Sequence, residues 1–283
     1  MKTWILASLA VLAIACGSNK GNNTDSANDA DNDVMDGDGD AGFIITDAPF
    51  SGMCTPNATA PQCSNCMDDD GDGKVDGFDI QCTGPLDNDE GSFSTGIPGD
   101  NIDAVDQDCF FDGDSGAGND GCSIHVCCLL GATSKATCPI GANRYDVTKC
   151  PAPLGSGMLT QKCIDTCGKL APPGCDCFGC CTLCDATTNQ CYDIATNPST
   201  SPNCTQDTLA DDTKCLRCVK NTMCGNGTCG GASCILCPGQ TQEDLPAECN
   251  MQMCPNGQVL CGPDNACATG TYCSNGCCIG TIL

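Results

Sequence analysis

The chain has 283 residues, of which 33 are cysteines, and a formal net charge of −25 at pH 7. Such a charge opposes binding to DNA, RNA or anionic lipid and favours binding to cations. Aromatic residues make up only 4% of the chain. Burial of apolar side chains alone will therefore not stabilise the fold, and we expect disulfides to do so.

Residues 1–15 are predicted to be a signal peptide. Lys2 precedes the uncharged run from Trp4 to Ala15, which is shorter than the roughly 20 residues that span a membrane as a helix. Cys16 follows the run directly and resembles the cysteine of a bacterial lipobox. Setting it aside leaves an even number of cysteines, so we predict that Cys16 is the lipid attachment site. The alternative is a plain secreted protein whose Cys16 pairs with another chain.

Residues 16–49 are predicted to comprise the lipidated cysteine and a disordered tether. The segment is rich in Gly, Ser, Asn, Asp and Ala and has few large apolar side chains. Such a composition does not bury enough surface to offset the entropy of ordering the chain. Asp36, Asp38 and Asp40 imitate the spacing of a calcium loop, but Ala41 stands where such a loop needs glycine.

Residues 50–92 are predicted to hold a calcium-binding loop. The 12 residues from Asp68 to Asp79 place aspartate at positions 1, 3, 5, 9 and 12 and glycine at position 6. Alternate carboxylates in this pattern converge on one hard cation, and a set of oxygen ligands suits calcium. A solvated acidic turn is the alternative. The predicted ligands are Asp68, Asp70, Asp72, the carbonyl of Lys74, Asp76 and Asp79.

Cysteines flank this loop where an EF-hand has amphipathic helices. Cys63 and Cys66 precede the loop, and Cys82 follows it. The pattern resembles the thrombospondin type 3 repeat, over one repeat and without the tandem array of that family. The resemblance implies a loop that winds around calcium and is held by disulfides.

Residues 93–200 are predicted to form one or more disulfide-rich modules. Gly, Pro, Asn and Cys interrupt each stretch before a helical period is established, which favours turns and short β-hairpins. Met158–Lys169 is the best helical candidate. Whether the acidic residues between 100 and 120 bind a second calcium stays open, because no template fits the possible ligands Asp100, Asp103, Asp106, Asp108, Asp112 and Asp114.

Residues 201–283 are predicted to form a disulfide-rich module with two similar segments. Cys218–Cys229 and Cys261–Cys273 share an order of Cys, Asx, Cys, Gly and Cys. The second segment resembles part of the Dickkopf N-terminal cysteine-rich region, and the Cys-Leu-Arg-Cys run from Cys215 to Cys218 also resembles that family. The resemblance implies a disulfide-stapled module. The receptor-binding part of the family is not matched, so Wnt antagonism is not implied.

Two further runs resemble cysteine-rich exported lipoproteins of Gram-negative bacteria. They are Gly174–Cys181, which holds four cysteines, and Asp108–Gly113. This resemblance implies a location in the cell envelope and no particular activity.

Cysteine pairs at zinc-ribbon spacing offer an alternative to disulfides in this region, namely Cys215, Cys218, Cys234 and Cys237. We expect disulfides instead, because the protein is predicted to be exported. The single histidine, His125, does not follow a Cys-x-x-Cys pair, so the chain has no c-type haem attachment motif. The Gly-Asp-Ser-Gly run at Gly113–Gly116 resembles that of trypsin-like proteases, but such a protease needs its histidine earlier in the chain than its serine, and His125 comes later. We therefore assign no catalytic residue and expect no enzymatic activity.

The sequence thus predicts small disulfide-rich modules, mostly loops and short β-hairpins, with little regular secondary structure. The predicted function is that of a non-enzymatic, calcium-stabilised lipoprotein of the outer membrane or cell surface, with a structural, adhesive or interaction role toward a protein or glycan partner. One alternative is a thiol-based metal-sequestering or redox protein, whose cysteines would be reduced. Another is a secreted eukaryotic cysteine-rich ligand, because N-glycosylation sequons begin at Asn22, Asn57, Asn203 and Asn226.

Overall fold

The computed structural model describes residues 55–97, 101–116, 118, 120–141, 144–262 and 265–281. These residues belong to one compact unit of the chain. The predicted signal peptide, the tether and several single residues lie outside the described ranges, namely Cys16, Asn22, Asp36, Asp38, Asp40 and Asp100.

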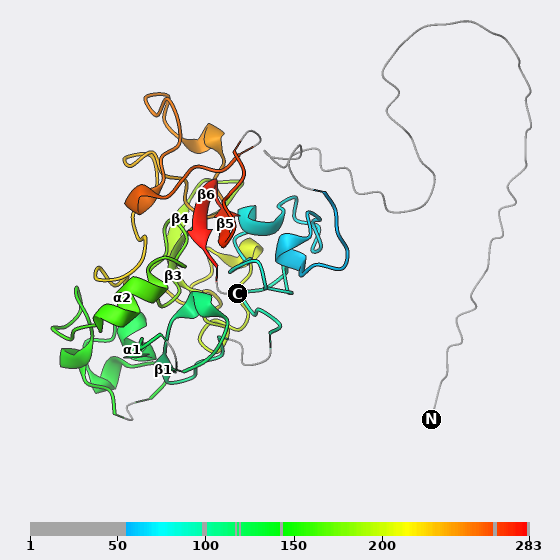
Figure 1. Cartoon of the computed structure of the whole chain (residues 1–283). Helices are drawn as coiled ribbons and strands as arrows, with labels where there is room; N and C mark the ends of the chain where they lie inside the picture. The colour runs from blue at the N-terminus through cyan, green and yellow to red at the C-terminus, as the bar shows by residue number, and fades with distance from the viewer. Residues whose placement is uncertain are drawn as a thin grey trace, which may run out of the picture. The chain divides into compact units, whose positions relative to one another are not determined.

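Regular secondary structure is sparse, and turns and loops dominate (Figure 1). Besides single turns of 3-10 helix, the described ranges contain two α-helices, α1 (Val126–Leu129) and α2 (Gln161–Cys167). The prediction of a disulfide-rich fold of loops and short hairpins is confirmed. The strands of the described ranges form three antiparallel pairs: β1 (Asp106–Gln107) with β2 (Ile124–His125), β3 (Cys180–Cys184) with β4 (Cys191–Ala195), and β5 (Thr271–Ser274) with β6 (Cys277–Gly280).

Helix α2 lies within the stretch predicted to be helical. Thr160 caps its first turn, because the Thr160 hydroxyl accepts a hydrogen bond of 3.0 Å from the Cys163 N–H. Cys163 and Cys167 are four residues apart and share one face of the helix. Both are fully buried, and they form disulfides with Cys122 and Cys109. No helix in the described part of the chain is long and apolar enough to cross a membrane.

Disulfides form much of the core. Fifteen of them join pairs of described cysteines, and Cys66 is disulfide-bonded as well. Every cysteine in the described ranges is thus oxidised. The largest buried cluster consists mainly of cystines packed around Tyr145 and Phe178. Such heavy disulfide bonding is typical of extracellular proteins.

Some disulfides join segments that are distant in the sequence. Cys177–Cys224 and Cys180–Cys218 link the predicted modules 93–200 and 201–283. The two similar segments of the last module pair differently. In the second segment, the outer cysteines Cys261 and Cys273 form a disulfide with each other. In the first segment, the outer cysteines Cys218 and Cys229 form disulfides with Cys180 and Cys237, which lie outside the segment.

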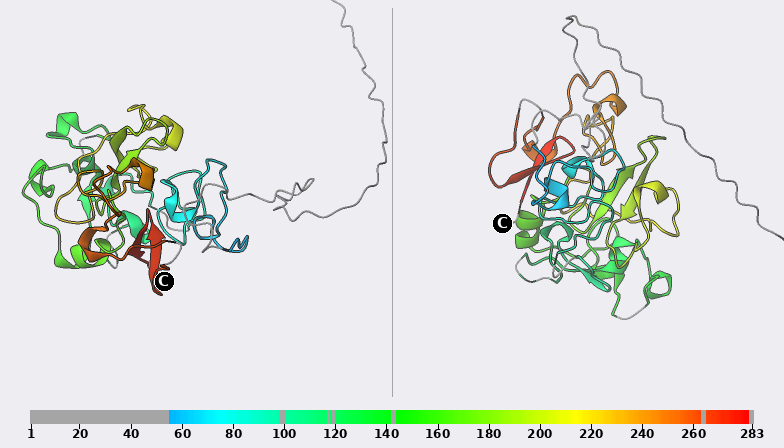
Figure 2. Two further views of the ribbon diagram at one scale, coloured as in Figure 1. Left: turned by 90° about the horizontal axis from the view of Figure 1, so that it is seen from above. Right: turned by 90° about the vertical axis from the view of Figure 1, so that its right-hand side faces the viewer.

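The predicted calcium loop packs against the C-terminal hairpin, so that segments from opposite ends of the described chain lie side by side (Figure 1, Figure 2). The Tyr272 hydroxyl on β5 donates a hydrogen bond of 2.8 Å to the carbonyl of Cys63. The Asn275 N–H donates to the carbonyl of Gly77 at 2.9 Å. The hairpin therefore contacts Cys63, which precedes the loop, and Gly77, which lies within it.

Candidate metal centre

The first turn of the acidic loop is organised by Asp68. Its two carboxylate oxygens accept hydrogen bonds from the N–H groups of Gly71 and Gly73, at 2.6 and 3.0 Å. Both glycines have left-handed backbones, with φ of +81° and +89°. Gly73 is the glycine that the loop pattern requires at position 6, and its conformation is the sharp turn expected there.

The three leading aspartates converge as the spacing predicts. One carboxylate oxygen each from Asp68, Asp70 and Asp72 lies within 4.8 Å of the other two. Asp70 accepts a hydrogen bond from the Asp72 N–H at 3.0 Å, and Asp72 accepts one from the Lys74 N–H at 2.7 Å. Burial raises the pKa of Asp70 and of Asp72. The loop thus gathers three negative charges at the surface.

Asp79 is not one of the three converging carboxylates, but it is near enough to feel the charges of Asp72 and Asp70, and it is only 2% exposed. Its Oδ1 accepts a hydrogen bond from the Gln81 N–H at 2.6 Å. Its Oδ2 is buried and receives no hydrogen bond from the described residues. Burial raises the pKa of Asp79 to about 9, and the charge of Asp72 is the next cause. A buried carboxylate without a donor is costly to keep ionised, so it either holds a proton or faces a cation.

Asp76 is turned toward the residues that precede the loop. Its carboxylate accepts hydrogen bonds from the N–H groups of Asn65 and Cys66, at 3.0 and 3.1 Å. Burial raises its pKa to about 6. Asp76 therefore ties the end of the loop to its beginning. Metal ligation by Asp76 and by the Lys74 carbonyl stays a prediction.

Two buried residues that the loop pattern does not contain also belong to this centre. Glu90 is fully buried, and its carboxylate accepts hydrogen bonds from the N–H groups of Asp69 and Asp76, at 2.6 and 2.9 Å. Burial raises its pKa to about 8. Gln81 donates to Asp70 at 3.4 Å, and its own side-chain oxygen is buried without a donor among the described residues. Sequence reasoning missed both, because neither occupies a position of the 12-residue template.

Acidic side chains gather at a second place in the chain. One carboxylate oxygen each from Asp108, Asp112 and Asp114 lies within 4.8 Å of the other two. Asp103 is buried beside Asp108, whereas Asp106 is exposed on β1. The structure therefore brings together four of the six acidic residues that fit no template.

The cysteines at zinc-ribbon spacing do not converge on a metal site. Each forms a disulfide with a different partner, in the pairs Cys204–Cys215, Cys180–Cys218, Cys234–Cys249 and Cys229–Cys237.

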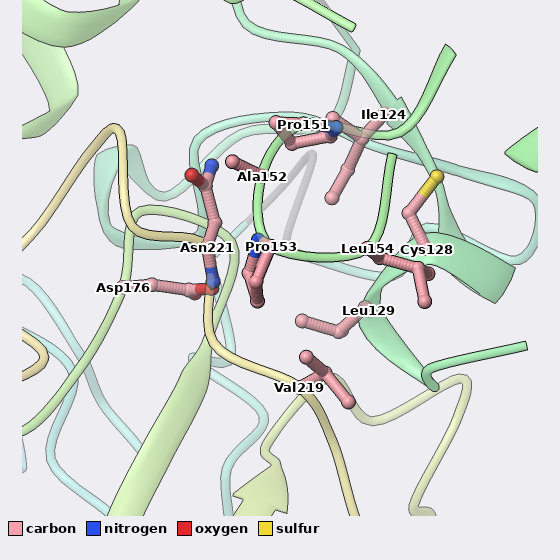
Figure 3. Close-up of a pocket in the computed structure, with 10 residues that line it drawn as sticks. All are labelled: Ile124, Cys128, Leu129, Pro151, Ala152, Pro153, Leu154, Asp176, Val219 and Asn221. Atoms are coloured by element: carbon pink, nitrogen blue, oxygen red, sulfur yellow. The ribbon is translucent and has the colours of Figure 1, made fainter. Parts of the chain in front are cut away.

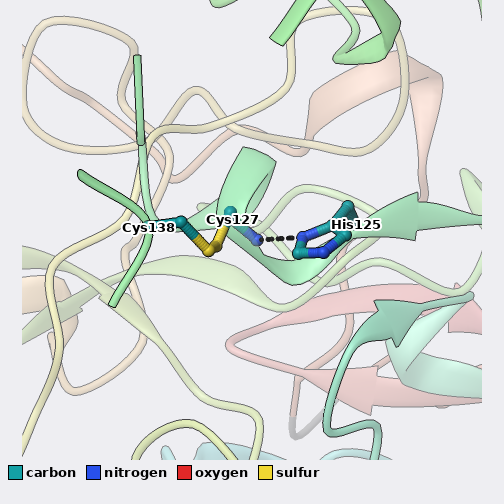
Figure 4. Close-up of side chains that lie close together, drawn as sticks. All are labelled: His125, Cys127 and Cys138. Atoms are coloured by element: carbon teal, nitrogen blue, oxygen red, sulfur yellow. Dashed lines mark hydrogen bonds between the residues drawn. A yellow bond between two sulfur atoms is a disulfide. The ribbon is translucent and has the colours of Figure 1, made fainter. Parts of the chain in front are cut away.

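His125 also lies close to two cysteines, Cys127 and Cys138 (Figure 4). These cysteines form a disulfide with each other. The Nδ1 atom of His125 accepts a hydrogen bond of 3.1 Å from the Cys127 N–H and so caps α1. We interpret this group as structural.

A small cavity is lined mainly by apolar residues and by the polar pair Asp176 and Asn221 (Figure 3). Its volume of about 10 Å³ is that of a single water molecule. Both oxygens of Asp176 are satisfied by backbone donors, namely the N–H groups of Phe178, Cys180 and Asn221, at 2.9, 3.0 and 2.7 Å. Asp176 is therefore a structural carboxylate.

The acidic loop offers only oxygen ligands, with charged groups at its surface and a buried acceptor that lacks a donor. Hard divalent cations prefer such a ligand set. The disulfides place the chain among disulfide-rich proteins of the extracellular type. Comparison with protein-family models, curated proteins and solved structures finds no match for this chain.

Proposed function

We propose that this chain is a calcium-stabilised, disulfide-rich protein of the cell envelope that acts through structure or interaction and without catalysis. The observation that carries the proposal is the buried Oδ2 of Asp79, which has no donor among the described residues and lies near the charges of Asp70 and Asp72. A calcium ion in the loop would supply the missing positive charge. An acidic turn that is merely solvated has no reason to bury such a group.

Calcium would act here as a structural ion. The loop lies between Cys63–Cys82 and the C-terminal hairpin, and Tyr272 connects the two. Ion binding to the folded loop therefore stabilises the contact between distant parts of the chain. Extracellular calcium modules bind with dissociation constants of roughly 0.1–1 mM, and we expect a value in that range.

Calorimetric titration of the native, disulfide-intact protein with calcium tests this function. The double variant Asp70→Asn, Asp72→Asn keeps the side-chain oxygens and removes two charges, so calcium affinity should fall by about tenfold or more. A matched control is Asp185→Asn, Asp211→Asn. These two aspartates also cap turns, through Thr188 and Thr213, and their loss removes the same charge. An equal response of both double variants to calcium would refute the proposal.

Anchoring through a lipid at Cys16 is the second part of the proposal, and it rests on the sequence. Oxidation of every described cysteine supports the parity argument and opposes the thiol-based alternative. Intact mass before and after reduction, together with membrane partitioning of Cys16→Ala, tests it. Unchanged partitioning of this variant, with normal leader cleavage, would exclude lipidation at Cys16.

The same mass measurement tests the secreted eukaryotic alternative. Asn57 and Asn203 are exposed and open to glycosylation. Asn226 is buried, and its amide donates to the carbonyl of Ala171, so a glycan does not fit there in the folded protein. Glycan mass at the two exposed sites would favour the alternative, and a mass without glycan would favour a bacterial lipoprotein.

A further inference from the structure

The second acidic group comes from one short segment of the chain, residues 108–114. Asp108 follows β1, Asp112 ends a 3-10 turn, and Gly113 with φ of +78° reverses the backbone before Asp114. The segment is fixed from within, because Cys109 forms a disulfide with Cys167 in the core. The three carboxylates therefore come from one short segment that Cys109 anchors to the core.

Asp108 is the unusual member of this group. It is only 1% exposed, and neither of its carboxylate oxygens accepts a hydrogen bond from any residue that the structure describes. Two other buried aspartates, Asp120 and Asp176, are satisfied by backbone donors. Asp120 is equally buried and accepts hydrogen bonds from the N–H groups of Cys109 and Cys122, at 3.1 and 3.0 Å. Asp176 accepts three such bonds. Among the residues that the structure describes, Asp108 therefore has none of the N–H donors that Asp120 and Asp176 have.

Its neighbours increase the deficit of positive charge. The Oδ2 of Asp112 is also buried without a donor among the described residues. Burial raises the pKa of Asp108 to about 9, and a side-chain hydrogen bond that the protonated Asp108 donates to Asp103 is the next cause. Burial raises the pKa of Asp112 to about 7, with Asp114 as the next cause. Three carboxylate oxygens that have no donor among the described residues thus belong to one group of like charges.

The group has one open side. Asp114 is exposed and Asp112 is half-buried, so the group faces solvent on the side of Asp114. Cys109 also lies near Asp112, but its sulfur is in a disulfide and is not available as a ligand. Oxygen ligands alone favour a hard divalent cation.

We propose that Asp108, Asp112 and Asp114 form a second site for a hard divalent cation, with Asp103 on its buried side. The ion would fix the segment between β1 and β2 as the first ion fixes the acidic loop. The rival explanation is that Asp103 and Asp108 share a proton and bind no ion.

Calcium stoichiometry of the full-length native protein tests the second site, by calorimetry or equilibrium dialysis up to about 10 mM. We expect Asp112→Asn, Asp114→Asn to bind one ion fewer than the parent protein. The Asp70→Asn, Asp72→Asn variant should lose a different ion, so combining the two pairs should remove both. Asp114→Asn alone changes only an exposed side chain, keeps the fold, and should weaken the second ion by about tenfold.

The outcomes separate this inference from the proposed function. If stoichiometry falls in Asp70→Asn, Asp72→Asn but not in Asp112→Asn, Asp114→Asn, with Asp114→Asn also unchanged, the second site is refuted and the first stands. If stoichiometry falls in Asp112→Asn, Asp114→Asn but not in Asp70→Asn, Asp72→Asn, the second site stands and the loop proposal fails. If the parent protein binds no calcium, both are overturned and proton sharing explains the buried pair.

Discussion

Replacing Asp79 by asparagine should have opposite effects with and without calcium. Asp79 is 2% exposed, and its Oδ2 has no donor among the described residues. Without the ion, burial holds the pKa of Asp79 at about 9, against an ordinary value of 3.8. At pH 7.5 the folded protein must therefore hold a proton that the unfolded chain has lost. Over roughly 3.7 pH units this costs up to about 5 kcal/mol of unfolding free energy.

Asparagine carries no charge to desolvate, and it offers amide donors to the nearby carboxylates. Asp79→Asn should therefore raise the stability of the calcium-free protein, by at most about 5 kcal/mol. For a chain of this size, each kcal/mol corresponds to about 2–4 °C in melting temperature. The calcium response should shrink at the same time. With a dissociation constant of about 0.1–1 mM, 10 mM calcium stabilises the parent protein by about 1.4–2.7 kcal/mol, and the variant should gain much less.

Thermal unfolding followed by circular dichroism, in chelator and in 10 mM calcium, measures both effects. Asp176→Asn is the matched control, because both Asp176 oxygens already accept backbone N–H groups. The NH2 group of an asparagine at this position would point at a backbone N–H, so one hydrogen bond would be replaced by two opposed donors. This variant should therefore lose stability both in chelator and in calcium. If Asp79→Asn behaves like Asp176→Asn, the reasoning about the unpartnered oxygen is wrong.

Three further predictions follow from the same region. In chelator, the unfolding free energy should fall as the pH rises from about 5 to 8. Burial raises the pKa of Glu90 from 4.5 to about 8, so the folded state binds more protons than the unfolded state in that pH range. Denaturant titrations in chelator measure this, and an unfolding free energy that rises with pH would contradict it. Tyr272→Phe removes the hydroxyl that donates a 2.8 Å hydrogen bond to the Cys63 carbonyl. The unfolding free energy measured by denaturant titration should fall by about 1–2 kcal/mol. An unchanged denaturation midpoint would contradict the contact. A Cβ on Gly77 would lie 1.9 Å from a backbone oxygen of β5. Gly77→Ala should therefore lower the unfolding free energy by about 2 kcal/mol or more and make the C-terminal hairpin more sensitive to protease. Gly84→Ala is the control, because Gly84 has open space around it, and equal protease resistance of the two variants would contradict the packing of Gly77 against β5.

The sequence alone predicts the features that depend on composition or on neighbours along the chain. Cysteine content and scarce aromatic residues predict a disulfide-rich fold with little regular structure, because too little apolar surface is available for a conventional core. The spacing of Asp68, Asp70 and Asp72 predicts their convergence, since a short loop with Gly73 at the turn needs only local backbone geometry. The helix within Met158–Lys169 is predicted for the same reason.

Only the tertiary structure decides the contacts between residues that are distant in sequence. Cys215 and Cys218 share a metal-site spacing, yet they pair with Cys204 and Cys180, because disulfide partners depend on which cysteines the fold brings together. Glu90 enters the acidic centre through the backbone of the loop, in a position that no sequence template specifies. The burial of Asp108 likewise results from packing. Charge spacing can be read along the chain, but whether a carboxylate meets an N–H donor, water or a cation depends on how the whole chain folds around it.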